Sequence, residues 1–236
     1  MTDTLAPKAV IGVMTPAMNT VVQPELEALR PTGVSNQMQR FRLGGERVSE
    51  DLFAEAEKLM DCNPKALAIG LTTDAGPGGV DKLAALCAEL EQHIGIPVCN
   101  ASIATQWGLR AIGAQRIAVL TPFNAEVDAI VKQNLEAGGF EVVRIKGTEA
   151  PSLPAICETP LSKIRETLLQ LADCECDAIA QVGTALPLVG LLDELEQQTG
   201  KTIIACNAAV YWQALRAAGI DEAVTGYGRL LGEIDK

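Results

Sequence analysis

The apolar segment Ile11-Gly12-Val13-Met14-Thr15-Pro16 recurs 106 residues further on, as Ile117-Ala118-Val119-Leu120-Thr121-Pro122. A second segment does the same, because Cys99-Asn100-Ala101 recurs as Cys206-Asn207-Ala208 at an offset of 107. Two separated segments that keep nearly one spacing indicate a duplicated unit of about a hundred residues. We therefore predict two similar lobes, residues 1–113 and 114–236, with a C-terminal segment that is free to pack back on the first lobe.

Within each unit, short apolar runs alternate with amphipathic stretches, which indicates strands buried on both faces and joined by crossover helices. The predicted strands lie near residues 9–14, 36–43, 66–71 and 96–99, and near 116–120, 140–145, 177–182 and 202–205. The predicted helices lie near residues 20–29, 49–60, 79–93 and 102–112, and near 125–137, 160–173, 187–198 and 208–218. We expect an α/β protein in which each lobe has a parallel four-stranded sheet flanked by helices.

The charge of the chain restricts its partners. The 236 residues carry a formal net charge of -11, and the pI is near 4.6. Because this negative field repels phosphates and anionic lipid surfaces, we expect neither a nucleic-acid nor a membrane partner. A small anionic substrate stays open, since donors close to a site can outweigh the net charge, and so does a homo-oligomer.

The cysteines and the N-terminal residues favour a cytoplasmic location. The seven cysteines are scattered and odd in number, which suits a reducing compartment better than a disulfide framework. The opening segment Met1-Thr2-Asp3-Thr4-Leu5 lacks the basic residues of a signal peptide, and no apolar run approaches the roughly 20 residues that span a bilayer. With His93 as the single histidine and no paired cysteine spacing, we expect no metal site.

Four loops that follow predicted strands concentrate polar groups. In parallel sheets, ligands bind beyond the carboxyl ends of the strands, and a helix N-terminus at that place favours an anion. The loops are Thr15-Pro16-Ala17-Met18-Asn19-Thr20, Gly70-Leu71-Thr72-Thr73-Asp74-Ala75-Gly76, Thr121-Pro122-Phe123-Asn124 and Gly183-Thr184-Ala185-Leu186-Pro187. Because they occupy equivalent places in both units, a carboxylate held between the lobes would meet donors from both sides.

Other interpretations of these loops stay open. Threonine and asparagine are common helix N-caps, and Thr-Pro is an ordinary way to end a strand and begin a helix, so each loop alone fits simple capping. A nucleotide site is disfavoured because the first loop contains neither the G-x-G-x-x-G nor the P-loop pattern. A flavin is disfavoured because the chain offers only eight aromatic residues to flank it.

Several segments spread over most of the chain match one family. They are Gly12-Val13-Met14-Thr15-Pro16-Ala17-Met18-Asn19-Thr20, the stretch from Gly95 to Gly113, the stretch from Arg116 to Phe123, Gly183-Thr184-Ala185-Leu186-Pro187 and Cys206-Asn207-Ala208. In these segments the chain resembles the aspartate/glutamate racemase superfamily, in the branch of maleate cis-trans isomerases and arylmalonate decarboxylases. The resemblance implies two pseudo-symmetric flavodoxin-like lobes with the active-site cleft between them, no cofactor, and chemistry performed by one or two cysteines.

The chain has no cysteine at either of the two positions where this family carries one. The resemblance places these positions at Leu71 and Gly183. A thiolate can carry a proton or attack carbon, whereas leucine and glycine can do neither. Racemisation or isomerisation by the usual thiol route is therefore disfavoured. Decarboxylation or elimination fits better, because a group other than a thiol can supply the single proton.

The resemblance also implies a substrate-binding set that the chain retains. Asparagine and threonine side chains in this set donate to substrate oxygens, and backbone N–H groups of the third-strand loops complete the cage. Its members are Pro16, Asn19, Thr72, Thr73, Phe123, Gly183 and Thr184. Because Phe123 stands where relatives often have tyrosine, one hydrogen bond of the cage is predicted to be absent or replaced.

Asp74 is the candidate for acid–base catalysis. A carboxyl group that is partly desolvated in a closed cleft can have a raised pKa and act as a base, whereas helix capping or solvent exposure is the alternative for Asp74. Cys99 and Cys206 follow strands and are interpreted as small buried hydrophobes. Arg40 and Arg42 share one face of a predicted strand and either balance a second carboxylate or are solvated at the strand edge.

These inferences lead to two hypotheses of different class. The first is a cofactor-independent lyase or isomerase, of the decarboxylase or maleate isomerase type, that acts on a small carboxylic or dicarboxylic acid. The second is a catalytically silent protein of the same fold that binds a small carboxylate.

Overall fold

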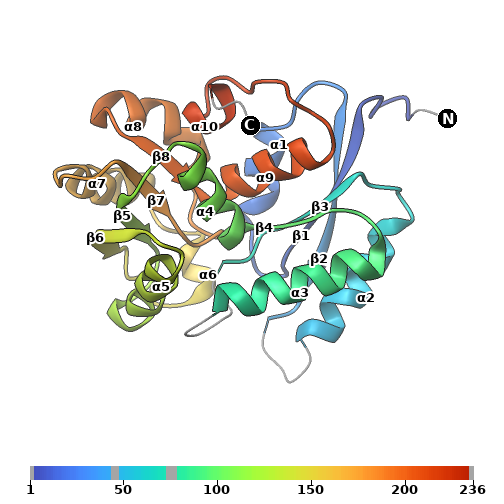
Figure 1. Cartoon of the computed structure of the whole chain (residues 1–236), viewed down its shortest axis with the longest axis horizontal. Helices are drawn as coiled ribbons and strands as arrows, with labels where there is room; N and C mark the ends of the chain where they lie inside the picture. The colour runs from blue at the N-terminus through green and yellow to red at the C-terminus, as the bar shows by residue number, and fades with distance from the viewer. Residues whose placement is uncertain (1–2, 44–47, 73–78, 234–236) are drawn as a thin grey trace.

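The computed structural model describes residues 3–43, 48–72 and 79–233 and contains two parallel sheets (Figure 1). The first sheet has the strand order β2-β1-β3-β4 and the second has the order β6-β5-β7-β8, so the two halves share one topology. The strands of the first sheet are β1 (Ala9–Pro16), β2 (Val34–Phe41), β3 (Ala66–Ile69) and β4 (Val98–Asn100). Those of the second are β5 (Arg116–Thr121), β6 (Glu141–Gly147), β7 (Ala178–Gln181) and β8 (Thr202–Ala205).

Helices follow the strands in both halves. In the first half they are α1 (Val22–Ala28), α2 (Val48–Met60), α3 (Gly79–Ile94) and α4 (Ala101–Ala111). In the second half they are α5 (Ala125–Ala137), α6 (Leu153–Ile156), α7 (Leu161–Ala172), the 3₁₀ helix η1 (Val189–Leu191), α8 (Leu192–Thr199), α9 (Cys206–Ala217) and α10 (Arg229–Gly232). This confirms the predicted α/β fold with a parallel four-stranded sheet in each half.

The short elements are where the sequence-based prediction is incomplete. It did not include α6 and α10, which have four residues each and are too short to show helical periodicity. It also placed one helix over residues 187–198, where the chain forms η1 and then α8.

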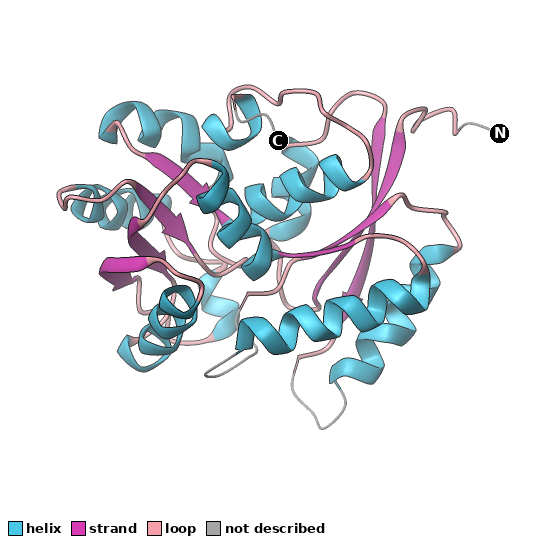
Figure 2. Cartoon of the chain, in the orientation of Figure 1, coloured by secondary structure: helices cyan, strands magenta, loops and turns pink. Residues whose placement is uncertain are grey.

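Helices α4 and α9 lie between the two sheets, in the middle of the molecule as seen in Figures 1 and 2. Helix α4 contacts β7 and β8 of the second sheet, whereas α9 contacts β3 and β4 of the first sheet, and the two helices pack on each other. Each half therefore covers part of the other half's sheet. The predicted boundary at residue 113 falls between α4 and β5.

One hydrophobic core runs through both halves. It includes Ile11 and Val13 of β1 together with Val119 of β5, and it continues through α4 and α9. A second, smaller cluster covers the other face of the first sheet, around Met14, Phe41 and Leu67. All eight residues of β1 are buried, as expected for a central strand of a parallel sheet with helices on both faces.

Within the described ranges, no helix is long and apolar enough to cross a membrane. The same ranges contain no group of three or more histidine, cysteine, aspartate or glutamate side chains that could hold a metal ion.

Candidate active site

A pocket lies where the loops after β1, β3, β5 and β7 converge, and its open volume is ≈ 40 Å³. Its polar lining comes from Asn19, Thr72 and Thr184. Its apolar lining comes from the side chains of Pro16, Met18, Leu43, Leu71, Phe123, Leu153, Ile156 and Ala185. None of the described lining residues is charged, so an anion in this pocket would rely on neutral donors and backbone N–H groups.

Asn19 connects the two halves of the pocket. It follows β1 and is 2% exposed. Its Oδ1 accepts hydrogen bonds from the backbone N–H groups of Val21 (2.8 Å) and Val22 (3.0 Å), which satisfies donors at the beginning of α1. Its Nδ2 donates to Oγ1 of Thr184 in the other half over 3.2 Å. The side chain thus combines a helix-start role with a contact across the molecule.

Thr184 joins three of the loops at one hydroxyl. It follows β7, and its Oγ1 accepts from Asn19 while it donates to the carbonyl oxygen of Gly70 over 3.1 Å. Gly70 follows β3 of the first sheet. Because all of these groups are buried, each lost hydrogen bond would leave an unpaired polar atom behind the pocket.

Two asparagines hold the third-strand loops from different positions, because Asn100 is the N-cap of α4 whereas Asn207 is the second residue of α9. Asn100 at the end of β4 donates from Nδ2 to the carbonyl oxygen of Leu71 over 3.0 Å. Asn207 in the first turn of α9 donates from Nδ2 to the carbonyl oxygen of Thr184 over 2.9 Å. Ser102 adds a bond from Oγ to the carbonyl oxygen of Thr72 (2.7 Å). The repeated Cys-Asn-Ala segment therefore fixes one pocket loop in each half.

Gly183 has a backbone conformation that favours glycine. Its φ is +114°, and a Cβ at this position would stand 2.5 Å from Cδ of Pro122. Residues with a side chain rarely adopt such a φ, and the proline ring would have to move. A cysteine at position 183 would therefore need a different loop conformation.

Phe123 forms part of the apolar wall. The polar groups of its loop find their hydrogen-bond partners within the second half. Its backbone N–H donates to Oγ1 of Thr121 over 3.2 Å, and the Thr121 hydroxyl donates to the carboxylate of Asp128 on α5. Burial raises the pKa of Asp128, and the bond from Thr121 acts in the opposite direction. Nearby, Asn124 accepts from the N–H of Val127, so it caps α5.

Arg40 supports the loop of Asn19. Its guanidinium donates to the carbonyl oxygens of Asn19 (2.7 Å) and Ala17 (3.3 Å), and to Oε1 of Gln23 (3.1 Å). It therefore holds the backbone after β1 from the strand beside it.

Cys99 and Cys206 are buried, as predicted, with exposed fractions of 4% and 0%. Burial raises the pKa of each thiol to about 12. Thiols with such pKa values stay protonated near neutral pH, which makes them poor nucleophiles and poor bases. No cysteine is among the described residues that line the pocket.

Six of the seven residues predicted to bind substrate lie in the pocket lining: Pro16, Asn19, Thr72, Phe123, Gly183 and Thr184. The seventh, Thr73, and the candidate base Asp74 lie outside the described residues. Asn100, Asn207 and Glu25 were not predicted from the sequence as supports of the site. The repeated Cys-Asn-Ala segment was a signal for the two asparagines, whereas nothing local marked Glu25.

Comparisons with known proteins agree with this fold. The family model "Arylmalonate decarboxylase" matches residues 12–231. A maleate isomerase of Nocardia farcinica is 26% identical over 237 residues, which cover 94% of this chain and 94% of the relative. An arylmalonate decarboxylase of Bordetella bronchiseptica is 26% identical over 196 residues, or 80% of each chain. The crystal structure of the maleate isomerase Iso from Pseudomonas putida S16 matches with a TM-score of 0.85 at 21% identity, covering 96% of this chain and 99% of that chain.

The two parallel four-stranded sheets define an α/β protein with the fold that the motif resemblance predicted. The chain belongs to the arylmalonate decarboxylase family, whose model covers most of its length.

Proposed function

We propose that this protein is a cofactor-independent lyase or isomerase that acts on a small carboxylic or dicarboxylic acid in the pocket between the sheets, by a route that uses neither of the family's usual cysteines. The observation that carries the proposal is the meeting of Asn19 and Thr184, one from each half, over 3.2 Å in the pocket lining. Neutral donors fixed in a buried site can stabilise a carboxylate and the charge that develops next to it.

The apolar walls favour decarboxylation over isomerisation. In decarboxylation the bond from the α-carbon to one carboxylate breaks, CO₂ leaves, and the electron pair remains on the α-carbon until a proton arrives. Walls such as Leu43, Leu71 and Ile156 cannot solvate the localised charge of the departing carboxylate. They therefore favour the transition state, in which that charge is spread toward the bound carboxylate.

Asp74 is the proposed source of the proton. Decarboxylation needs one proton for the α-carbon, and the buried thiols of Cys99 and Cys206 are poor donors because their pKa values are raised to about 12. In the sequence Asp74 follows Thr72 and Thr73 directly. Its carboxyl would donate to the carbanion and recover a proton from water.

The test is incubation with phenylmalonate, methylmalonate, maleate and hydroxy or amino diacids, followed by NMR analysis in D₂O. We expect CO₂ release from a substituted malonate, with one deuterium at the α-carbon of the product, and loss of this activity in Asp74→Asn. Glu89→Gln, on the helix that follows, serves as the matched loss of one acidic charge and should keep the activity. A correctly folded protein that is silent across the whole panel would remove the proposal.

The second candidate function is carboxylate binding without turnover. It is favoured by Leu71 and Gly183, which stand at the positions where the motif resemblance places the family's cysteines. Thermal stabilisation by phenylmalonate or maleate, without any product over days, would support this candidate.

A further inference from the structure

A carboxylate of the first half reaches into the second half behind the pocket. Glu25 lies on α1, and its Oε1 accepts from the backbone N–H groups of Leu188 (2.7 Å) and Val189 (2.8 Å). Its Oε2 accepts from Nδ2 of Asn207 over 2.7 Å. Glu25 is not part of the pocket lining, yet it contacts the second half at three points.

Asn207 carries this connection to the pocket. One proton of its amide goes to Glu25 and the other goes to the carbonyl oxygen of Thr184 over 2.9 Å. The hydroxyl of Thr184 then contacts Asn19. The Oδ1 of Asn207 is buried and has no partner in the described part of the chain. The amide nevertheless keeps this orientation, because a flip would turn its oxygen toward two acceptors.

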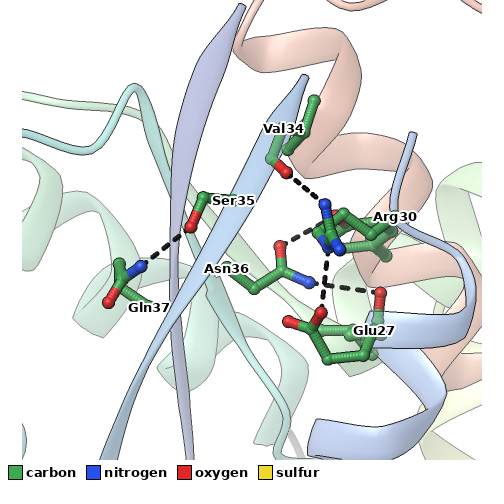
Figure 3. Close-up of polar contacts among 8 residues, drawn as sticks. Glu27, Arg30, Val34, Ser35, Asn36 and Gln37 are labelled. Atoms are coloured by element: carbon green, nitrogen blue, oxygen red, sulfur yellow. Dashed lines mark hydrogen bonds and ion pairs between the residues drawn. The ribbon is translucent and has the colours of Figure 1, made fainter. Parts of the chain in front are cut away.

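Helix α1, which carries Glu25, is itself fixed in place (Figure 3). Asn36 on β2 donates to the carbonyl oxygen of Leu26 over 3.2 Å and accepts from the Tyr211 hydroxyl of α9 over 2.8 Å. Arg30 donates to the carbonyl oxygen of Val34 over 2.7 Å, which holds the turn after the helix. The carboxylate of Glu25 thus projects from a helix that is tied to both its own sheet and α9.

We infer that Glu25 is a positioning residue of the pocket, which acts through Asn207 and the backbone of residues 188–189 to hold Thr184 where it and Asn19 can bind one carboxylate. This inference rests on the proposed function. Its basis is that a carboxylate at position 25 lets Asn207 turn both amide protons toward acceptors.

The variant Glu25→Gln separates positioning from simple packing. Glutamine has the shape of glutamate, and its oxygen can still accept from Leu188 and Val189. Its NH₂ group then faces the NH₂ group of Asn207. Asn207 therefore loses its hydrogen bond either to residue 25 or to Thr184. We therefore expect the carbonyl of Thr184 to lose part of its support, although the volume at position 25 is unchanged.

Glu196→Gln is the matched control. Glu196 is 3% exposed, accepts from the N–H groups of Ile203 (2.7 Å) and Arg229 (2.8 Å), and has a pKa that burial raises, as it does for Glu25. These contacts lie within the second half and involve no pocket loop. It therefore reports the general cost of replacing a buried carboxylate.

The experiment measures calorimetric affinity for phenylmalonate and maleate, together with amide hydrogen exchange of residues 183–189 in the full-length protein. In Glu25→Gln we expect about tenfold weaker binding, the effect of roughly one hydrogen bond, and faster exchange at residues 183–189. In Glu196→Gln we expect both to stay within about twofold of the parent protein. Unchanged affinity and unchanged exchange in Glu25→Gln would overturn the inference.

A double variant distinguishes the positioning of Thr184 from a purely structural connection between the halves, because it compares stability with diacid affinity. In Glu25→Gln with Asn207→Asp, the new amide can donate to the new carboxylate, so the connection between the halves is restored. Thr184 still lacks its donor, so stability should recover while diacid affinity does not. Full recovery of affinity would contradict the role of Asn207. If the parent protein bound neither diacid, the proposed function would fail. The hydrogen-exchange data for residues 183–189 would still test whether Glu25 holds this segment in place.

Discussion

The Thr-Pro pairs at the ends of β1 and β5 lead into loops that use their polar groups differently. In the first half, Asn19 directs its amide across the molecule to Thr184. In the second half, Asn124 caps its own helix and Thr121 donates to Asp128, so both polar side chains are satisfied locally. The first loop contributes to the contact between the halves, whereas the second presents the ring of Phe123 to the pocket.

This difference shows that the two halves are alike in the contacts that support the pocket and unlike in the groups that face it. The supporting contacts are similar, because Ser102 and Asn207, each the second residue of its helix, donate to the carbonyl oxygens of Thr72 and Thr184. The groups that face the pocket are not, since Leu71 and Gly183 occupy equivalent places with different side chains and different backbone conformations. The duplicated fold thus provides a symmetric support for an asymmetric site.

The largest effect should come from placing cysteine at the two unlike positions. Gly183→Cys forces a side chain into a backbone with φ of +114° and against Pro122, and we expect it to lower the free energy of unfolding by about 3 kcal/mol. Leu71→Cys should lose only about 1–2 kcal/mol, the effect of a smaller buried side chain. Urea unfolding of both variants checks this. Equal stability of the two would show that the third-strand loops are more alike than their backbones indicate.

The next effect concerns the two loop asparagines. Asn19→Ala removes a donor at the pocket, and we expect affinity for phenylmalonate to fall by about 30-fold, the equivalent of about 2 kcal/mol. Asn124→Ala removes a cap at the equivalent place, which should lower the free energy of unfolding by about 1 kcal/mol and leave affinity unchanged. Calorimetric titration and urea unfolding of the pair measure both quantities. A similar loss of affinity in the two variants would contradict the claim that Asn19 serves the pocket whereas Asn124 only caps its helix.

A smaller gain is expected from Phe123→Tyr. The Cζ atom of Phe123 lies 3.6 Å from the place where a Cβ of residue 183 would stand, so a hydroxyl added to Cζ would enter the pocket near Gly183. One extra neutral donor should improve diacid affinity about fivefold, the equivalent of about 1 kcal/mol. Titration calorimetry tests this, with Phe123→Leu as the control that changes the wall without adding a donor. Weaker binding in the tyrosine variant would mean that the ring packs against the ligand itself.

The smallest effect is expected at Asp128, which satisfies Thr121 away from the ligand. Burial raises the pKa of Asp128 above its usual 3.8, so the folded state keeps the proton at a pH where the unfolded state has already lost it. Stability from this group is therefore lost as the pH rises from about 4 through the folded-state pKa. Asp128→Asn should flatten this part of the pH profile of stability and leave diacid affinity unchanged. Thermal unfolding between pH 3.5 and 7 in ~0.1 M salt, where exposed charges are largely screened, tests this expectation. An unchanged profile would contradict it.

Most of the fold followed from local sequence. The eight strands and the longer helices were predictable because apolar runs such as residues 9–14 and 117–120 alternate with amphipathic stretches, and the duplication showed that the order repeats. The short helices α6 and α10 were not predictable, because a single turn has no period to detect. The pocket lining was largely predictable, since Asn19, Thr72 and Thr184 all follow apolar strands.

The supports of the pocket were not predictable in the same way. Glu25 looks like an ordinary acidic residue in the first turn of a helix, which is a common position for such a residue. Its partners Leu188 and Asn207 lie 163 and 182 residues further along the chain. Arg40 likewise holds the loop of Asn19 from the neighbouring strand, a contact set by strand order rather than by spacing.

The amino-acid sequence alone determined the duplicated α/β architecture, the loops that carry polar groups and the absence of cysteine at positions 71 and 183, because periodicity, turns and residue identity are local properties. Only the tertiary structure determined that α4 and α9 each pack on the opposite sheet, that Asn19 meets Thr184, and that Gly183 has a φ unfavourable for a side chain. These features depend on how buried polar atoms from distant segments find partners when the two sheets pack together, which no local pattern specifies.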